Sequence, residues 1–388
     1  MALPLSYNVR NVIVRWKVTL LALGGISLVV AVLIALTAMA NGFSKALAAT
    51  GSPDNAIVTQ RGSVSELSSG FGIEDASMII VDPRVKRDAQ GRPMASPEMV
   101  VVASLPKRDD GTEVQVTVRG VTPMAFNVRQ NVRIVEGRAF TPGLYELVVG
   151  KKAADRYQGL EVGGRITLQR KSWDVVGIYT SEGSGFESEI WGDVTTLQPV
   201  FNRAGGYQSL TVRLADPATL EAFDKDLRAN PNMQVQAASE LQYYEGQAGQ
   251  TASTLTALAI FVGIIMGVGA VFGAMNTMYA LVSARTREIG TLRALGFSRA
   301  AILVSFMIES AFLALIGGLL GSILALPINL LSGATGGANF SQVAFDFRVS
   351  PFWLAVAVVL AVLMGLAGGF LPAFRAARTP ITAALRDA

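Results

Sequence analysis

The residues that most enzymes use for acid–base, nucleophilic or metal chemistry are partly missing from this chain. Its 388 residues include no histidine and no cysteine. These absences exclude a Ser-His-Asp triad, imidazole catalysis, cysteine nucleophiles, disulfides and thiolate metal sites. Carboxylate, lysine, tyrosine or serine chemistry remains, or a function without covalent chemistry. The spacing of the carboxylates, lysines and serines therefore decides whether the chain has a catalytic site.

Three short motifs carry the remaining candidate chemistry, and none has the spacing of a known site. Ser184 lacks the glycine two residues earlier that a nucleophile elbow needs. The run from Gly150 to Lys152 lacks the upstream glycine and the Ser or Thr of a P-loop. An acidic trio could form an acid–base pair but fits no particular site, so we expect a solvated surface: Glu182, Glu187 and Glu189. The sequence predicts no catalytic centre, bound cofactor or metal site.

Four stretches of low charge are long enough to cross a bilayer, which takes about 20 apolar residues. Only 16% of the residues are charged and the mean hydropathy is +0.42, whereas soluble domains have about 25% charged residues. The first stretch also has features of a signal peptide. Its apolar core, about 23 residues, exceeds the roughly 7–15 of a signal peptide, so we expect an uncleaved anchor. Glu309 is the one charge inside a predicted span.

The short flanks of these spans are basic on one side of the membrane. They contain only two acids, Glu288 and Asp387, against ten basic residues: Arg10, Arg15, Lys17, Arg285, Arg287, Arg293, Arg299, Arg375, Arg378 and Arg386. By the positive-inside rule, both termini and the loop between the second and third spans lie in the cytoplasm. The prediction is a multi-pass protein of the bacterial inner (plasma) membrane that binds no nucleic acid.

The predicted fold is an α-helical membrane protein with four transmembrane helices and a large extracytoplasmic (periplasmic) α+β domain between helices 1 and 2. The expected segments follow in chain order: a cytoplasmic amphipathic N-terminal segment, 1–17; transmembrane helix 1, 18–41; the extracytoplasmic domain, 42–250; transmembrane helix 2, 251–284; a cytoplasmic helix and loop, 285–299; transmembrane helix 3, 300–331; an extracytoplasmic loop, 332–351; transmembrane helix 4, 352–374; and a cytoplasmic tail, 375–388.

The segment between the first two spans has the size and patterning of a folded domain. It contains 22 Lys and Arg against 25 Asp and Glu, a net charge of −3. Asp216 and Pro217 fit the start of a helix that continues to Ala229, and from Ser239 the helical pattern runs towards the second span. Alternating runs predict strands: 56–59, 99–103, 113–119, 147–150, 165–168, 173–179 and 209–214. Two segments rich in Gly and Ser, 63–72 and 181–188, are expected to be mobile loops.

The loop after the second span predicts a short helix with two faces, from Arg285 to Leu295. Gly296 fits a left-handed residue just past the last turn, and Ser298 can cap the following span. A helix this short is marginal alone, so it should pack against something. Anionic lipid headgroups and a groove on a cytoplasmic protein are equally compatible with its residues.

Two parts of the sequence resemble the MacB/FtsX-like permease family of ABC transporters. In the loop they are Met275-Asn276-Thr277-Met278, then Arg285-Thr286-Arg287-Glu288-Ile289-Gly290, then Leu292-Arg293-Ala294-Leu295-Gly296. At the end of the chain they are Gly368-Gly369-Phe370-Leu371-Pro372-Ala373, Ala376-Ala377-Arg378-Thr379-Pro380 and Ala383-Ala384-Leu385-Arg386. The layout of one span, a large exported domain and three spans is similar throughout.

The resemblance implies that the short helix is a coupling helix that lies in a cleft of a cytoplasmic ATPase. The residues carried over to that role are Arg285, Arg287, Glu288, Ile289, Leu292, Arg293 and Leu295. Because the sequence has no G-x-x-x-x-G-K-[ST] motif, we expect the ATPase, with its ATP and magnesium, to be a separate chain. A second permease copy in a homodimer, a periplasmic adaptor (membrane fusion) protein and an outer-membrane channel are further implied partners.

The spans contain small residues at intervals of four, which allow helices to approach closely in lipid. The pairs are Gly263/Gly267, Gly269/Gly273, Gly317/Gly321 and Gly365/Gly369. We expect most to pack within one subunit and some to form a dimer seam. For Glu309 a structural anchor paired with an arginine is favoured over a proton or substrate site.

The function that these features favour is a permease that moves an amphiphilic cargo, such as a lipid, lipoprotein, peptide or drug, when a partner ATPase closes. The alternative is a regulator of the FtsX type, which transmits motion to an extracytoplasmic enzyme or sensor and moves no cargo. A membrane-bound enzyme is disfavoured because the chain lacks histidine, cysteine and an acid–base constellation.

Overall fold

The structure is a computed structural model that describes residues 16–337 and 340–380. Most of the predicted segment 1–17, and the last part of the tail with Arg386 and Asp387, lie outside the described residues. The chain divides into two compact units. The span unit comprises residues up to 41, 253–331 and 347 onward, and the α/β unit comprises 42–252 and 332–346.

Four helices in the described part are long and apolar enough to cross a membrane, as the sequence predicts. They are α2 (Trp16–Ala48), α8 (Glu240–Ser283), α10 (Arg299–Ala325), which the 3-10 turn η4 (Leu326–Leu330) extends, and α11 (Pro351–Arg378). The short helix α9 (Thr286–Ala294) joins α8 to α10. The predicted helical run from Ser239 is confirmed, because α8 is one helix of 44 residues that begins at Glu240.

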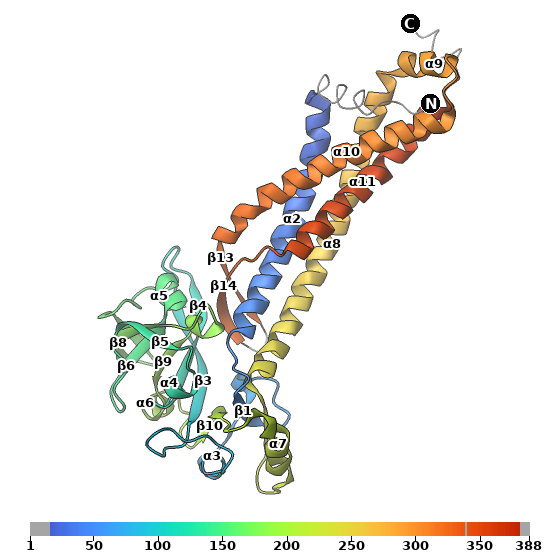
Figure 1. Ribbon diagram of the computed structural model, residues 1–388. Coiled ribbons are helices and arrows are strands. Elements are labelled where there is room, and N and C mark those ends of the chain that lie inside the picture. Colours follow the sequence, from blue (N-terminus) through green and yellow to red (C-terminus); the bar gives the residue numbers. More distant parts are fainter. Residues whose placement is uncertain (1–15, 338–339, 381–388) are drawn as a thin grey trace. The chain divides into compact units, whose positions relative to one another are not determined.

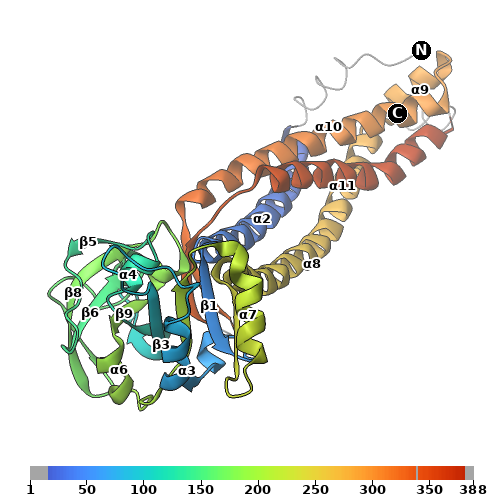
Figure 2. The same ribbon diagram turned by 60° about the horizontal axis from the view of Figure 1, so that its bottom comes forward.

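Small residues allow the helices of the span unit to pack closely. A Cβ on Gly365 would lie 2.2 Å from the Cβ of Ala314 on α10, and one on Gly321 would lie 2.5 Å from the carbonyl oxygen of Ser27 on α2. The hydroxyl of Ser310 donates to the Gly365 carbonyl at 2.5 Å. Helices α10 and α11 lie side by side in both views (Figures 1 and 2). These glycines pack within one chain, as expected for most of the small residues.

The α/β unit is built on a ten-stranded mixed sheet with the strand order β12-β1-β11-β3-β4-β9-β6-β8-β5 and β7 beside β8. Its strands are β1 (Asn55–Gln60), β3 (Ala95–Pro106), β4 (Glu113–Val121), β5 (Arg133–Gly137), β6 (Glu146–Gly150), β7 (Arg165–Leu168), β8 (Lys171–Thr180), β9 (Ile190–Asp193), β11 (Ser209–Arg213) and β12 (Val235–Ser239). The strands β2 (Phe71–Gly72) and β10 (Gly206–Tyr207) form a separate pair. Each predicted strand overlaps an observed one.

Short helices and turns cover this sheet. The helices are α3 (Ile73–Ile80), α4 (Ala125–Val128), α5 (Lys151–Arg156), α6 (Val194–Val200) and α7 (Leu220–Ala229), and the 3-10 turns are η1 (Glu66–Ser68), η2 (Gly185–Ser188) and η3 (Pro217–Thr219). Asp216 caps η3 by accepting from the Ala218 amide at 3.0 Å. The predicted helix 217–229 therefore begins with a 3-10 turn and becomes α-helical at Leu220.

Two of the three hydrophobic cores of the α/β unit define lobes that meet on strand β3. The β1 lobe has a core from β1, β11, β12, α3 and α7, with Phe223 fully buried. The β6 lobe has a core from β4, β6, β8, β9, α5 and α6, with Trp173 fully buried. Strand β3 pairs with β11 up to Glu98 and with β4 from Met99 onward. Glu98 therefore lies at the seam between the lobes.

Two paired strands lie within 332–346, in the segment 332–351 that the sequence predicted as an extracytoplasmic loop. Its strands are β13 (Ser332–Gly337) and β14 (Phe340–Asp346), and both belong to the α/β unit. The rings of Phe43 and Phe345 meet edge to face with centroids 5.7 Å apart, and the Ala344 amide donates to the Ser188 hydroxyl at 2.8 Å. This strand pair thus contributes to the core of a unit that the sequence assigned to residues 42–250 alone.

Candidate functional site

The short helix α9 has an inner face that packs against three other helices of the span unit. Ile289 is 3% exposed and lies in a cluster with residues of α8, α10 and α11, which includes Met278, Phe306 and Ala373. Gly296 has φ +95° just after the helix, and Ser298 caps α10 by accepting from the Ala301 amide. Both terminal signals predicted from the sequence are confirmed. They fix where α9 ends and where α10 begins.

Arg285 and Glu309 form a buried ion pair beneath α9. The Arg285 Nη1 atom lies 2.8 Å from Glu309 Oε2, and the two side chains are 6% and 2% exposed. Arg285 also reaches Glu288 Oε2 at 3.3 Å, and its guanidinium lies 5.0 Å from the centroid of the Phe306 ring. Glu309, which lies in the first half of α10, is thereby paired with the arginine that precedes α9.

The seven residues assigned to ATPase coupling fall into three groups by exposure in the structure. Arg285 and Ile289 point into the span unit and are buried. Leu292 and Arg293 are half-buried, and Arg293 Nη1 donates to the Ala377 carbonyl at 3.0 Å. The exposed members are Arg287, Glu288 and Leu295, with Leu295 73% exposed. The exposed face of α9 therefore includes only three of the seven residues that the sequence analysis assigned to ATPase coupling.

The four glycines of α8 also fall into two groups. Gly263 and Gly267 face α2 and α11, since a Cβ on them would meet Leu33 at 3.2 Å and Met364 at 3.1 Å. They line an apolar groove of about 530 Å³ among α2, α8 and α11. A Cβ on Gly269 or Gly273 would meet nothing within 4 Å. Of the four glycines, Gly269 and Gly273 are therefore the two that another molecule could approach, as far as the described residues show.

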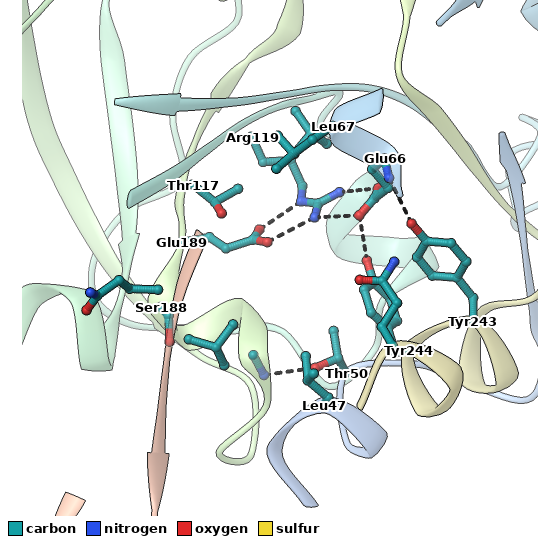
Figure 3. Close-up of a pocket in the computed structure, with 15 residues that line it drawn as sticks. Leu47, Thr50, Glu66, Leu67, Thr117, Arg119, Ser188, Glu189, Tyr243 and Tyr244 are labelled. Atoms are coloured by element: carbon teal, nitrogen blue, oxygen red, sulfur yellow. Dashed lines mark hydrogen bonds and ion pairs between the residues drawn. The ribbon is translucent and has the colours of Figure 1, made fainter. Parts of the chain in front are cut away.

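In the α/β unit, Arg119 belongs to a buried cluster of six charged side chains at the seam between the lobes. Arg119 is 2% exposed and uses all five of its N–H donors. It bonds Glu66 at 2.7 and 3.1 Å, Glu189 at 2.7 and 2.9 Å and Glu98 at 2.8 Å. Figure 3 shows the guanidinium of Arg119 between Glu66 and Glu189.

Arg129 extends this ion cluster to the start of α8. It pairs with Glu98, with one contact at 3.1 Å, and its Nε donates to Glu240 Oε1 at 3.0 Å. The fourth donor bonds the Thr211 hydroxyl at 2.8 Å. Its guanidinium lies 4.6 Å from the centroid of Phe186. Residues from α8, β3 and β11 are thus held by one arginine.

The first turns of α8 complete the cluster. The Tyr244 hydroxyl donates to Glu66 Oε2 at 3.1 Å, and the Tyr243 hydroxyl accepts from the Glu66 amide at 2.8 Å (Figure 3). Glu240 accepts from the Asn55 side-chain amide at 2.9 Å and from the Ser52 backbone amide at 3.2 Å. The adjoining cavity is only about 40 Å³, room for about one to three waters, whereas a pocket for a small-molecule ligand needs about 300 Å³.

Four carboxylates and two guanidiniums make the cluster acidic overall, and burial acts on them in different ways. Burial alone raises the pKa of Glu66, but the charge and hydrogen bonds of Arg119 outweigh it and lower that pKa to about 2. Burial raises the pKa of Glu240, although Arg129 and Asn55 oppose this. Burial also raises the pKa of Tyr244 well above its usual range. Tyr244 is therefore a hydrogen-bond donor at neutral pH.

The prediction of a solvated acidic trio in a mobile loop is wrong for two of its members. Glu189 belongs to the ion cluster, and its Oε2 also accepts from Trp191 Nε1 at 2.8 Å. Glu187 is 4% exposed and accepts from the Thr180 hydroxyl and from the Ser181 and Gly183 amides at 2.6–2.9 Å. Only Glu182 is exposed. Glu187 therefore orders the segment 181–188, which contains the turn η2.

Sequence reasoning did not find the ion cluster. Glu66 and Arg119 are 53 residues apart, and Arg129 and Glu240 are 111 residues apart. One available signal was that Glu98 is the one charged residue of its strand and directly precedes an apolar run, 99–103. A charge in such a strand is buried only when it is paired.

Comparison with known proteins accounts for the layout of the chain. The family described as MacB-like periplasmic core domain matches residues 19–230, and the family described as FtsX-like permease C-terminal matches residues 260–381. The Macrolide export ATP-binding/permease protein MacB of Bordetella avium is 30% identical over 313 residues, which is 75% of this chain and 46% of the relative.

A second relative covers more of the chain. The protein of the same name from Neisseria meningitidis serogroup A is 25% identical over 408 residues, 98% of this chain and 60% of the relative. The chain thus spans about half the length of the curated relatives it matches. The crystal structure of the periplasmic region of MacB from Actinobacillus actinomycetemcomitans covers 53% of this chain and 94% of its own at 12% identity, but its TM-score of 0.37 adds nothing to the argument.

The first match covers the first span and most of the α/β unit, and the second match covers most of the three spans that follow. The four long apolar helices, with a domain inserted after the first, have the same order. We conclude that this chain belongs to the MacB-like and FtsX-like permease family.

Proposed function

We propose that the chain is the permease subunit of an ATP-driven transporter of the MacB type. Its relatives are named as ATP-binding/permease proteins for macrolide export, and permeases of this family work with ABC ATPases. The work of this subunit is mechanical: closure of the ATPase moves the spans, and their motion reshapes the extracytoplasmic domain, which exports or extracts the cargo. The ATP and its magnesium bind to the ATPase, which is a separate subunit.

The observation that carries this proposal is the division of α9 into a fixed face and a free face. Ile289 and the Arg285–Glu309 pair hold the helix on α8, α10 and α11, so a displacement of α9 is passed to three helices at once. Arg287 and Leu295 remain exposed, and they combine a charge with an apolar anchor. Such a pair suits a protein groove better than a lipid surface, which favours a wider apolar face.

The basic flanks of the spans place α9 and both termini in the cytoplasm of a bacterial inner membrane in this proposal. A homodimer then requires a seam in the lipid, for which Gly269 and Gly273 are available because a Cβ on either would meet nothing within 4 Å among the described residues. A periplasmic adaptor and an outer-membrane channel are proposed as further partners on the other side of the membrane.

The cargo that we propose is amphiphilic. Support comes from the apolar groove of about 530 Å³, which is lined by residues such as Val29, Phe272 and Trp353. A lining of this kind suits an apolar chain or ring system. The cargo class includes lipids, lipoproteins, peptides and hydrophobic drugs.

Reconstitution with an ABC ATPase that co-purifies with this chain tests the proposal against the regulatory alternative. The purified complex in liposomes is given a macrolide or a fluorescent phospholipid as probe, and ATP hydrolysis and probe movement are both measured. Export predicts that a probe raises hydrolysis and changes compartment only with ATP. Hydrolysis that no probe changes, with no probe moved, contradicts export and favours a regulator of the FtsX type.

A further inference from the structure

The ion cluster lies in the α/β unit at a place where both lobes and the start of α8 meet. Strand β3 changes partner between Glu98 and Met99, so the two lobes share this strand at Glu98. Glu98 is fully buried and bonds both arginines. The helix α8 begins with Glu240, which is also fully buried. A displacement of this helix end must therefore either break the cluster or move what the cluster holds.

Each lobe is bonded to α8 through different members of the cluster. Towards the β1 lobe, Glu240 bonds Asn55 on β1, and its partner Arg129 bonds Thr211 on β11. Towards the β6 lobe, Tyr244 bonds Glu66, whose partner Arg119 lies on β4. The two connections start from residues one helical turn apart and meet at Glu98, which bonds both arginines.

The physical properties of the cluster favour a stiff connection. Bidentate arginine–carboxylate pairs fix orientation as well as distance, and those of Arg119 are excluded from water. Arg129 cannot rotate freely, because its guanidinium lies 4.6 Å from the Phe186 centroid and 5.7 Å from the Trp191 centroid. In the described residues no group of three or more acidic side chains has the arrangement of a metal site, and the adjoining cavity has no room for cargo.

We propose that the ion pair of Arg129 and Glu240 is the contact through which α8 moves the two lobes relative to one another. This inference rests on the proposed function, since ATPase closure supplies the displacement of α8. Arg129 is then a positioning residue: it touches no cargo, and it transmits the movement of α8 to Glu98 at the seam.

The test measures the distance between the lobes in the complete complex. Because the chain has no cysteine, Lys225→Cys on α7 and Ser172→Cys on β8 give two unique exposed sites for spin labels. The labelled chain is diluted with unlabelled chain, assembled with the ATPase, and compared without nucleotide and with Mg-ATP and vanadate. The wild-type distance distribution should change on trapping. The same pair in an Arg129→Met/Glu240→Met chain should lose most of that change.

The controls separate a transmitting role from a structural one. The double substitution removes one charge of each sign, and the emission of the buried residue Trp173, which lies outside the cluster, reports whether the unit remains folded. If the double variant does not fold, Arg129→Lys replaces it in the test. This variant keeps the charge but cannot bond Glu98, Thr211 and Glu240 together, so it should also reduce the change in the distance between the lobes. Arg138→Met/Glu146→Gln breaks an ion pair of the same unit that is not part of the ion cluster and should leave the change intact.

The outcomes distinguish this inference from the function on which it rests. A wild-type chain that binds no ATPase overturns the proposed function. A chain that binds and stimulates the ATPase but shows no change between the lobes overturns this inference alone. A full wild-type change in folded Arg129→Met/Glu240→Met or Arg129→Lys also overturns it.

Discussion

The two units of the molecule each bury arginine–glutamate pairs, and they do so in different ways. In the span unit, Arg285 meets one buried carboxylate, Glu309, and one exposed carboxylate, Glu288. In the α/β unit, Arg119 meets three carboxylates. A site near the bilayer must be close to neutral because charge is costly there. The α/β unit tolerates an acidic excess because tyrosine, serine and tryptophan donors supplement the arginines.

This difference predicts which charges can be removed. In a one-to-one pair both partners matter equally, and replacing both should restore stability. In the acidic cluster the arginines are limiting, so removing an arginine should cost far more than removing a carboxylate.

The largest effect is expected from Arg119→Met. It leaves Glu66, Glu98 and Glu189 without a shared counter-charge, and breaking even one buried pair costs about 3–5 kcal/mol. We expect a loss of about 5 kcal/mol in the free energy of unfolding of the α/β unit. The measurement is the unfolding of the full chain in detergent, followed by the emission of the buried residues Trp173 and Trp191. A loss below about 1 kcal/mol would contradict the idea that the arginines are limiting.

In the span unit, Arg285→Met should cost about 3 kcal/mol, because Glu309 loses its guanidinium partner in a buried position. The double variant Arg285→Met/Glu309→Leu should return to within about 1 kcal/mol of the wild type. Thermal inactivation of ATPase binding in detergent provides the comparison. Equal losses in the single and double variants would show that the pair has a role other than mutual neutralisation.

Glu66→Gln should cost about 2 kcal/mol near neutral pH and remove a specific pH dependence. The pKa of Glu66 falls from 4.5 to about 2 on folding. Its contribution is therefore fully present above pH 4.5 and is lost as the pH falls through 2. Wild-type stability measured from pH 6 to 2 should fall more steeply than that of the variant. Parallel curves would contradict this assignment.

The smallest effect is expected from Glu240→Gln. Burial raises the pKa of Glu240, so its contribution has the opposite sign: it is present below the ordinary pKa and is lost as the pH rises through the raised value. Replacing it with a neutral amide at neutral pH should change the free energy of unfolding by less than about 1 kcal/mol. A loss comparable to that of Arg119→Met would show that Glu240 is needed as a charged partner.

The two buried sites also differ in how much of them the sequence predicts. Glu309 stands out because it is the one charge in an apolar span, and Gly296 and Ser298 mark the end of α9 and the start of α10. These are local signals. The ion cluster lacks them: its members are spread from Glu66 to Glu240 among 22 basic and 25 acidic residues, and which of these pair depends on strand order. The strand pair within 332–346 was missed for a related reason, since Ser332–Gly337 has mostly small residues and no clear alternation.

The central claim is that the free face of α9 receives the ATPase, and binding of the ATPase tests it most directly. Tagged chains carrying Leu295→Asp or Arg287→Glu are purified with the co-expressed ATPase. Two controls are purified in the same way. Leu292→Asp changes a half-buried side chain that packs in the cluster of α8, α10 and α11, and Lys225→Ala changes an exposed side chain outside α9. The account predicts that Leu295→Asp and Arg287→Glu reduce the bound ATPase at least tenfold at unchanged thermal stability, whereas Leu292→Asp also lowers stability. Wild-type amounts of ATPase on both Leu295→Asp and Arg287→Glu would contradict it.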